Sequence, residues 1–78
     1  MHLGLYQHYK GNFYRVMAVG RLEETLEEVV IYHAMQGNYE VWVRPIKVFN
    51  ETIEIEGKEI PRFKFIKPLF SEAEVLIS

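Results

Sequence analysis

Hydrophobic and polar positions alternate with a period of two over much of this chain, a pattern typical of β-strands. Residues 29–35 are rich in β-branched side chains and predict one strand. Gly37-Asn38 favours a tight turn after it, and residues 39–44 predict the second strand of a hairpin. In this second strand Tyr39, Val41 and Val43 occupy one face, and Glu40, Trp42 and Arg44 occupy the other. Pro45 ends the strand because it has no amide hydrogen to donate.

Residues 13–19 predict a further strand. Arg15 is its clearly polar side chain, so much of this strand is expected to be covered on both sides. A strand's period places Phe13, Met17 and Val19 on one face, which a short barrel leaves uncovered. An apolar patch of this kind marks a contact with another chain, so a homodimer or a partner protein is one interpretation. The other is that the C-terminal Leu69-Phe70 and Val75-Leu76-Ile77 fold back and shield the patch.

Residues 53–55 and 63–65 alternate apolar and charged side chains. This pattern predicts a second hairpin across residues 56–59, with its apolar side chains facing inward. Pro61 is expected at the edge of this hairpin or at a bulge, because proline cannot donate to a strand ladder.

The remaining segments are expected to be connections. Residues 8–12 favour a turn. Residues 20–28 are acidic and irregular, and a long loop or a strand that begins early is preferred there over a very short helix. Residues 46–51 predict a connection in which Phe49 acts as an aromatic plug, and residues 67–78 predict a C-terminal tail.

About five short strands in a chain of 78 residues cannot bury their apolar faces as one flat sheet. Closing or rolling the sheet buries these faces and removes exposed edges. The sequence therefore predicts a single all-β domain over residues 1–78, a small SH3-like barrel or roll of antiparallel strands. No long segment has the helical period that a helix-covered sheet would require.

Composition supports a globular domain and excludes several classes of function. Hydrophobic residues make up 49% of the chain, and the absence of cysteine excludes disulfides and thiolate metal sites. The net charge of −2 argues against broad attraction to nucleic acid or anionic membranes. No apolar run approaches the roughly 20 residues of a membrane span, and residues 1–6 lack the features of a signal peptide. A cytoplasmic location without a membrane partner is expected.

Several motifs occur in a fixed order along the chain. They are Tyr6-Gln7-His8-Tyr9-Lys10-Gly11-Asn12-Phe13-Tyr14-Arg15-Val16, Glu24-Thr25-Leu26-Glu27, residues 29–32, Trp42-Val43-Arg44-Pro45, Phe49 and Arg62-Phe63. Together they resemble the bacterial family catalogued as domain of unknown function 1653, over Gly4 to Ile66. The resemblance implies an SH3-type barrel, in agreement with the strand pattern, and it implies no established activity.

The chain departs from the usual pattern of that family at two places. Leu22-Glu23 stands where relatives usually carry a His-Ser pair before the Glu-Thr, so a proton-transfer or ligand role for that pair does not carry over. Gln36 replaces a tyrosine that the family often places before the hairpin glycine, which reduces the expected aromatic surface.

The candidate ligand-binding face centres on Trp42 and Arg44, two residues apart on one strand face and about 7 Å from each other. A planar guanidinium beside an indole suits carboxylates, phosphates or stacked bases. Glu24 and Glu27 either complete such a site or pair with Arg44 while Trp42 closes one end of the barrel. The full candidate set is His8, Tyr9, Lys10, Glu24, Thr25, Glu27, Trp42, Arg44 and Arg62.

These residues favour a small binding or accessory module whose ligand is unknown: a small molecule, a peptide or a nucleic acid. Binding of nucleic acid would need the basic residues to form a stripe, which requires the strand at residues 13–19 to adjoin the hairpin at residues 53–65. These basic residues are Lys10, Arg15, Arg44, Arg62, Lys64 and Lys67. The glutamates of the same hairpin oppose that interpretation.

The alternative is an enzyme or enzyme-associated domain that uses His8, Lys10, Glu24 and Arg44. The chain contains no aspartate and shows no nucleophile motif, which weakens this alternative. The three histidines lack the short paired spacing of structural zinc sites, so neither a metal nor a cofactor is expected.

Overall fold

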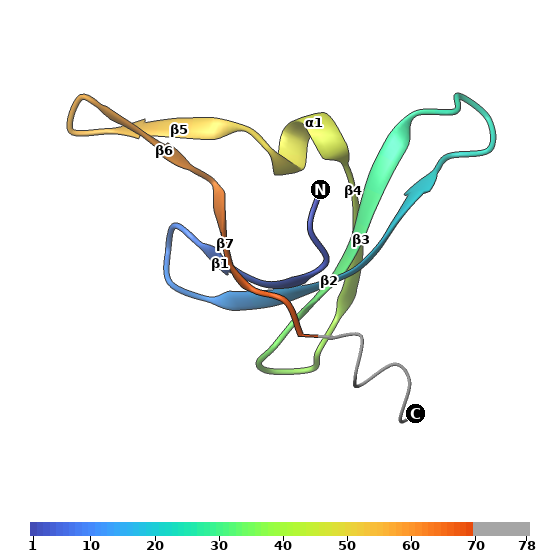
Figure 1. Cartoon of the computed structure of the whole chain (residues 1–78), viewed down its shortest axis with the longest axis horizontal. Helices are drawn as coiled ribbons and strands as arrows, with labels where there is room; N and C mark the ends of the chain where they lie inside the picture. Colours follow the sequence, from blue (N-terminus) through green and yellow to red (C-terminus); the bar gives the residue numbers. More distant parts are fainter. Residues whose placement is uncertain (70–78) are drawn as a thin grey trace.

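A computed structural model of the protein describes residues 1–69. The elements follow one another in the order β1 (Gly4–His8), β2 (Phe13–Arg21), β3 (Glu28–Ala34), β4 (Val41–Pro45), α1 (Ile46–Phe49), β5 (Thr52–Ile55), β6 (Lys58–Pro61) and β7 (Phe63–Lys67) (Figure 1). The all-β class predicted from the sequence is confirmed. Most of the expected C-terminal tail, from residue 70 onward, lies outside the described residues. No helix within residues 1–69 is long and apolar enough to cross a bilayer.

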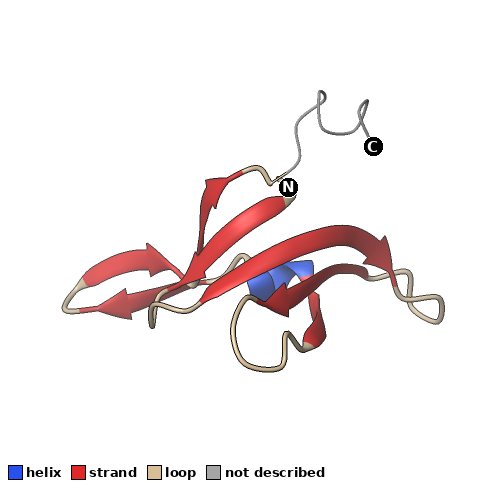
Figure 2. Ribbon diagram, turned by 90° about the horizontal axis from the view of Figure 1, so that it is seen from below, coloured by secondary structure: helices blue, strands red, loops and turns tan. Residues whose placement is uncertain are grey.

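Two antiparallel sheets make up the domain. The larger one has five strands in the order β4-β3-β2-β1-β7, and the smaller one pairs β5 with β6. Figure 2 shows the β5–β6 ribbon to one side of the larger sheet and α1 against one face of it. The expected barrel is not closed, because β4 and β7 stand at opposite edges of the larger sheet and do not pair with each other.

The predicted pairing of residues 53–55 with 63–65 is wrong. β5 pairs instead with β6 across Glu56-Gly57, and both turn residues have positive φ, 51° and 79°. Two-residue turns of this kind match the twist of the flanking strands, so they close a tighter hairpin than the one expected. β7 pairs with β1, a strand that the sequence pattern did not predict.

A bulge in β2 changes which side chains share a face. Val16 lies opposite Tyr32 and Ala18 lies opposite Ile31, so Met17 is the extra residue between them. Directly opposed residues share a face, and Val19, opposite the buried Val30, therefore lies on the covered face. The expected grouping of Val19 with Phe13 and Met17 is wrong for this reason.

The connection between β2 and β3 is an exposed loop, as preferred from the sequence. It is shorter than expected, because β2 continues to Arg21 and β3 begins at Glu28. Leu22 N–H donates to the Glu27 carbonyl at 2.9 Å, and Leu26 adopts a positive φ of 62°. These features make residues 22–27 a compact turn rather than a helix.

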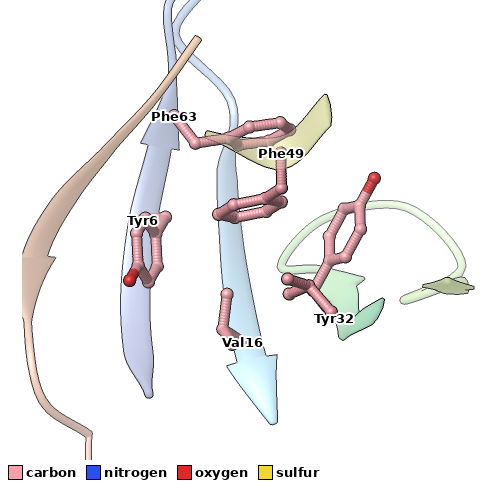
Figure 3. Close-up of a cluster of buried hydrophobic side chains, with 6 residues drawn as sticks. Tyr6, Val16, Tyr32, Phe49 and Phe63 are labelled. Carbon is pink, nitrogen blue, oxygen red and sulfur yellow. The ribbon is translucent and has the colours of Figure 1, made fainter. Parts of the chain in front are cut away.

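The core lies on one face of the larger sheet, called here the inner face, and consists of buried residues from five elements (Figure 3). They are Tyr6, Val16, Val30, Tyr32, Phe49 and Phe63. Phe49 comes from α1, is 1% exposed and stacks on Phe63 with ring centroids 4.3 Å apart. Its ring also meets Tyr6 and Tyr32 edge-on, at 5.3 Å each. Phe49 is therefore the aromatic plug that the sequence predicts.

Candidate functional site

Strand register brings the side chains of β3 and β4 together on the inner face. Tyr32 lies opposite Trp42, and Val30 lies opposite Arg44. Since Val30 and Tyr32 belong to the core, Trp42 and Arg44 project from the same face of the sheet as the core residues. α1 covers the centre of this face through Phe49 and leaves the β4 side more exposed.

A pocket of about 230 Å³ opens at that uncovered part of the inner face. Its lining residues come from five strands: His8, Tyr14, Tyr32, Trp42, Arg44 and Phe63. Trp42 is 48% exposed and forms an accessible wall, whereas Tyr32 and Phe63 are buried and form the floor. The pocket is thus a continuation of the aromatic core that no side chain of residues 1–69 fills.

Edge-to-face contacts hold the aromatic floor of the pocket in place. Ring centroids lie 5.7 Å apart for Tyr14 and Tyr32, 5.5 Å for Tyr14 and Phe63, and 5.7 Å for Tyr32 and Phe63. Aromatic pairs favour such arrangements because the positive ring edge meets the negative ring face. These contacts therefore fix the shape of the pocket floor.

Arg44 supplies the permanent positive charge of the pocket. Its guanidinium carbon lies 5.8 Å from the centroid of the Phe63 ring, and its charge lies close enough to Tyr32 to act on the pKa of that phenol. Burial raises the pKa of Tyr32, and the neighbouring Arg44 charge opposes that rise. The phenol remains protonated at neutral pH, so Tyr32 has a hydroxyl hydrogen to donate.

His8 forms the wall of the pocket opposite β4. The backbone N–H of Lys10 donates to its Nδ1 at 3.1 Å, which places the proton of the neutral ring on Nε2. Burial lowers the pKa of His8, and the positive charges of Arg62, Lys10 and Arg44 lower it further. The positive charges of Arg62, Lys10 and Arg44 therefore all act on the His8 end of the pocket.

Arg62 stands behind His8 rather than in the pocket lining. Its backbone carbonyl accepts from the Tyr9 N–H at 2.9 Å, and its Nη2 lies 3.7 Å from Oε1 of Glu51. Both side chains of this ion pair are partly exposed, so the pair is weak. Arg62 thus anchors the turn that carries His8 and adds positive charge nearby.

Tyr9 and Lys10 lie on the far side of His8. The Tyr9 ring packs against the His8 ring in a tilted arrangement, with centroids 4.5 Å apart, and the Lys10 Nζ lies 5.8 Å from the Tyr9 ring centroid. A second hollow of about 440 Å³ separates this turn from β6 and is lined by Gln7, His8, Tyr9, Gly11, Ile60, Pro61 and Lys64. His8 is the wall that the two hollows share.

The predicted acidic part of the site is placed elsewhere. Glu24, Thr25 and Glu27 are exposed in the turn between β2 and β3, and none of them lines either hollow. The Thr25 hydroxyl accepts from the Glu27 N–H at 3.2 Å, which is a contact within the turn. Figure 1 shows this turn at the opposite end of the molecule from the β1–β2 turn that carries His8.

Three aromatic residues of the pocket were not among the sequence candidates: Tyr14, Tyr32 and Phe63. The hairpin turn at residues 35–40 fixes Tyr32 opposite Trp42, so hairpin register was the signal that could have identified Tyr32. Phe63 reaches the pocket through the pairing of β7 with β1, which the alternation of residues 63–65 does not reveal.

The described residues bring together no group of metal ligands, and they do not gather all the basic residues on one face. Within residues 1–69 there is no group of three or more His, Asp or Glu side chains that could hold a metal ion. Arg15 lies opposite His33, one position along β3 from the inner-face Tyr32, so it projects from the outer face while Arg44 lies on the inner face. The cations considered for nucleic acid are therefore divided between two faces.

Fold and pocket define the class of this protein: a small all-β domain on an open antiparallel sheet, with an aromatic pocket that contains an arginine. The model of the DUF1653 family, described as a protein of unknown function, matches residues 4–65, and the chain belongs to this family. The resemblance seen in the sequence motifs is thereby confirmed.

A crystal structure of a DUF1653 protein from Bordetella bronchiseptica is similar to this chain. The two share 30% sequence identity, the match covers 92% of this chain and 95% of that one, and the TM-score is 0.80. A comparison with curated proteins found no match. The comparisons therefore support the fold and leave the function to be inferred from the pocket.

Proposed function

We propose that this protein is a small binding module that takes a planar, anionic group into the pocket lined by Trp42 and Arg44. The observation that carries the proposal is the composition of the lining: aromatic walls, one arginine and one histidine, with no carboxylate among the lining residues. A guanidinium recognises carboxylate and phosphate through paired hydrogen bonds. The aromatic walls then stack on a flat group attached to that anion.

Electrostatics distinguishes this proposal from recognition of a methylated cation. Aromatic cages bind quaternary ammonium groups, and the walls alone would suit such a ligand. Arg44 already lies over the Phe63 ring, however, and the charges that lower the pKa of His8 would repel a second cation. An anion in the pocket would instead be attracted by Arg44 and by the other positive charges near His8.

The size of the pocket limits what enters it. Its volume of about 230 Å³ is below the roughly 300–1,000 Å³ of sites for drug-sized molecules. One ring with one attached anionic group is the size of ligand that it suits. A larger ligand would place such a group in the pocket and extend along the surface.

Trp42 is the single tryptophan of the chain, so its fluorescence reports directly on the pocket. We expect benzoate and phenyl phosphate to change this fluorescence saturably, and the neutral benzamide and the cationic phenyltrimethylammonium to bind more weakly. Arg44→Gln should weaken benzoate binding about 10–100-fold, because it removes a charge-assisted hydrogen bond. Arg15→Gln, on the outer face, is the matched control and should leave binding unchanged. Tighter binding of phenyltrimethylammonium than of benzoate would refute the proposal.

The alternative of an enzyme that uses His8, Lys10, Glu24 and Arg44 gains nothing from the placement of these residues. His8 and Arg44 line the pocket, whereas Lys10 lies over Tyr9 and Glu24 lies in the β2–β3 turn. General acid–base catalysis requires groups within hydrogen-bonding reach of one substrate atom. The binding proposal needs only the residues that do converge.

A further inference from the structure

β4 is an edge strand whose residues are unusually exposed for a strand of this sheet. It pairs with β3 on one side, and on its other side it has no strand neighbour within residues 1–69. Val41, Trp42 and Val43 are 58%, 48% and 58% exposed. Exposed apolar edges are templates for pairing with another strand, and proteins usually protect them.

The opposite edge of the same sheet is protected. β7 carries Lys64 and Lys67 on its exposed side, and its pairing with β1 contains a bulge between Leu5 and Tyr6. Lysine and bulges both disfavour edge-to-edge pairing. The contrast singles out β4 as the edge that is able to accept a partner strand.

The hydrogen-bonding groups of β4 point alternately toward β3 and away from it. Ala34 N–H donates to the Glu40 carbonyl at 3.1 Å, which makes Glu40 and Ala34 a hydrogen-bonded pair. Since such pairs alternate along an antiparallel ladder, Trp42 also bonds to β3, and the N–H and C=O groups of Val41 and Val43 point away from the sheet. Pro45 lies opposite Val29 in a non-hydrogen-bonded pair, so its lack of an N–H costs the β3–β4 ladder no hydrogen bond.

Residues 40–44 read Glu-Val-Trp-Val-Arg, a sequence complementary to itself when two copies run antiparallel. We infer that the protein forms a homodimer in which β4 pairs with the β4 of a second copy, centred on Trp42. In this register Val41 faces the partner's Val43, and each valine offers the outward N–H and C=O that a hydrogen-bonded pair requires. Glu40 faces the partner's Arg44, so the charges at the ends of the paired segment are complementary.

The same register places Trp42 opposite the partner's Trp42 at the non-hydrogen-bonded position. Side chains are closest at such positions, and paired aromatic side chains stabilise them. The outward hydrogen-bonding groups of the valines, the opposite charges of Glu40 and Arg44 and the pairing of Trp42 with itself therefore all favour the register centred on Trp42. A shift that centred the pairing on Val43 would lose the Glu40–Arg44 complementarity and oppose Pro45, which cannot donate, to the partner's Val41.

The mass of the full-length protein in solution, followed by light scattering as concentration increases, tests the inference. We expect a dimer. Val43→Pro should make the protein monomeric at concentrations where the wild type is dimeric, because it removes an outward N–H and leaves the β3 ladder intact. Val43→Thr keeps this N–H and a β-branched side chain, and it should remain dimeric. A wild type that is monomeric up to millimolar concentration, or a dimeric Val43→Pro variant, would overturn the inference.

Charge exchange tests the register itself. Glu40→Arg places like charges opposite each other and should weaken the dimer at least about tenfold. Combining it with Arg44→Glu reverses both charges and should restore dimerisation. A double variant that is no more dimeric than Glu40→Arg would exclude the Trp42-centred register.

Amide hydrogen exchange at Val41 and Val43 distinguishes a second copy from a segment of the same chain on this edge. In the dimer their protection should decrease on dilution. Protection that is independent of concentration, in a monomeric protein, would contradict the inference and would indicate that residues of the same chain cover β4. These measurements require no ligand, so their outcome is independent of the binding proposal.

Discussion

Phe49 is the side chain that joins α1 to the aromatic core of the sheet. It is 1% exposed, and it touches Tyr6, Tyr32 and Phe63, which come from three different strands. We predict that Phe49→Ala lowers the free energy of unfolding by about 3–5 kcal/mol, because it leaves a cavity where α1 meets the sheet.

Urea denaturation followed by Trp42 fluorescence would measure this loss. Val48→Ala, one residue earlier in α1 at a side chain that is 37% exposed, is the control and should cost less than about 1 kcal/mol. Equal losses in the two variants would contradict the assigned role of Phe49.

The pKa of His8 makes stability depend on pH. Burial and the charges of Arg62, Lys10 and Arg44 lower this pKa in the folded state below the ordinary value of 6.5. The unfolded chain therefore takes up a proton at a higher pH than the folded one. The contribution of neutral His8 to the free energy of unfolding is fully present above pH 6.5, and it is lost as pH falls through the lowered pKa of the folded state.

Unfolding free energies measured across this pH range for the wild type and His8→Gln would isolate the effect. We expect the wild type to lose stability relative to the variant as pH decreases. Parallel pH profiles for the two proteins would show that His8 does not titrate as described.

For individual residues, the alternation of apolar and polar side chains over residues 39–44 predicted that Trp42 and Arg44 share a face. It could not predict that Tyr14 and Phe63 complete the pocket, because they reach it through pairings with distant strands. Nor could it place Glu24 and Glu27, because the direction of an exposed turn follows from the length of the strands that flank it.

Among the elements, β1 depends on a glycine at its first position. Gly4 has a φ of +137°, and a Cβ there would lie 2.5 Å from the Lys67 carbonyl oxygen. We predict that Gly4→Ala destabilises the protein by at least about 1–3 kcal/mol, since backbone strain adds to a clash with the β7 backbone.

Gly20→Ala is the matched control within β2. Its φ is not positive, and a Cβ would meet the Ile31 Cδ1 at an ordinary 3.8 Å. This variant should be neutral, or more stable by up to about 1 kcal/mol. Thermal unfolding of both proteins would separate the two expectations.

Local patterns predicted the strands β2 to β5 and β7 well, but they misassigned what β5 and β7 pair with. Alternation indicates that a segment is a strand and which side chains share a face, and it does not name the neighbouring strand. The short β6 contains Pro61 and two charged residues, so it carried almost no strand signal. The bulge at Met17 could not be predicted either, because it is defined by the register between β2 and β3, and alternation within one strand does not reveal that register.

For the whole molecule, the sequence predicted that apolar faces must be covered, but the predicted closure into a barrel was wrong. Phe13, Val19 and Ile55 are also more exposed than expected, at 40%, 39% and 42%. The need to cover apolar faces is met by curvature of the sheet and by Phe49, which leaves β4 as an open edge. If a second copy pairs with that edge, folding and association are linked.

The midpoint of thermal unfolding should then rise with protein concentration in the wild type, and it should be independent of concentration in Val43→Pro. Scanning calorimetry at several concentrations would measure this. A concentration-independent midpoint in a demonstrably dimeric wild type would indicate that dissociation precedes unfolding and contributes little to stability.

The pairing of β1 with β7 joins segments from opposite ends of the described chain, Leu5 with Lys67 among them. Contacts so distant in sequence form slowly, because a long loop must close before they contribute free energy. During synthesis on the ribosome, β1 to β4 can associate as a local meander, because each of these strands pairs with its neighbour in sequence. The other edge of β1 stays unpaired until β7 has been translated. Until then the inner-face aromatic residues are exposed, so the nascent domain is most prone to aggregation immediately before β7 emerges.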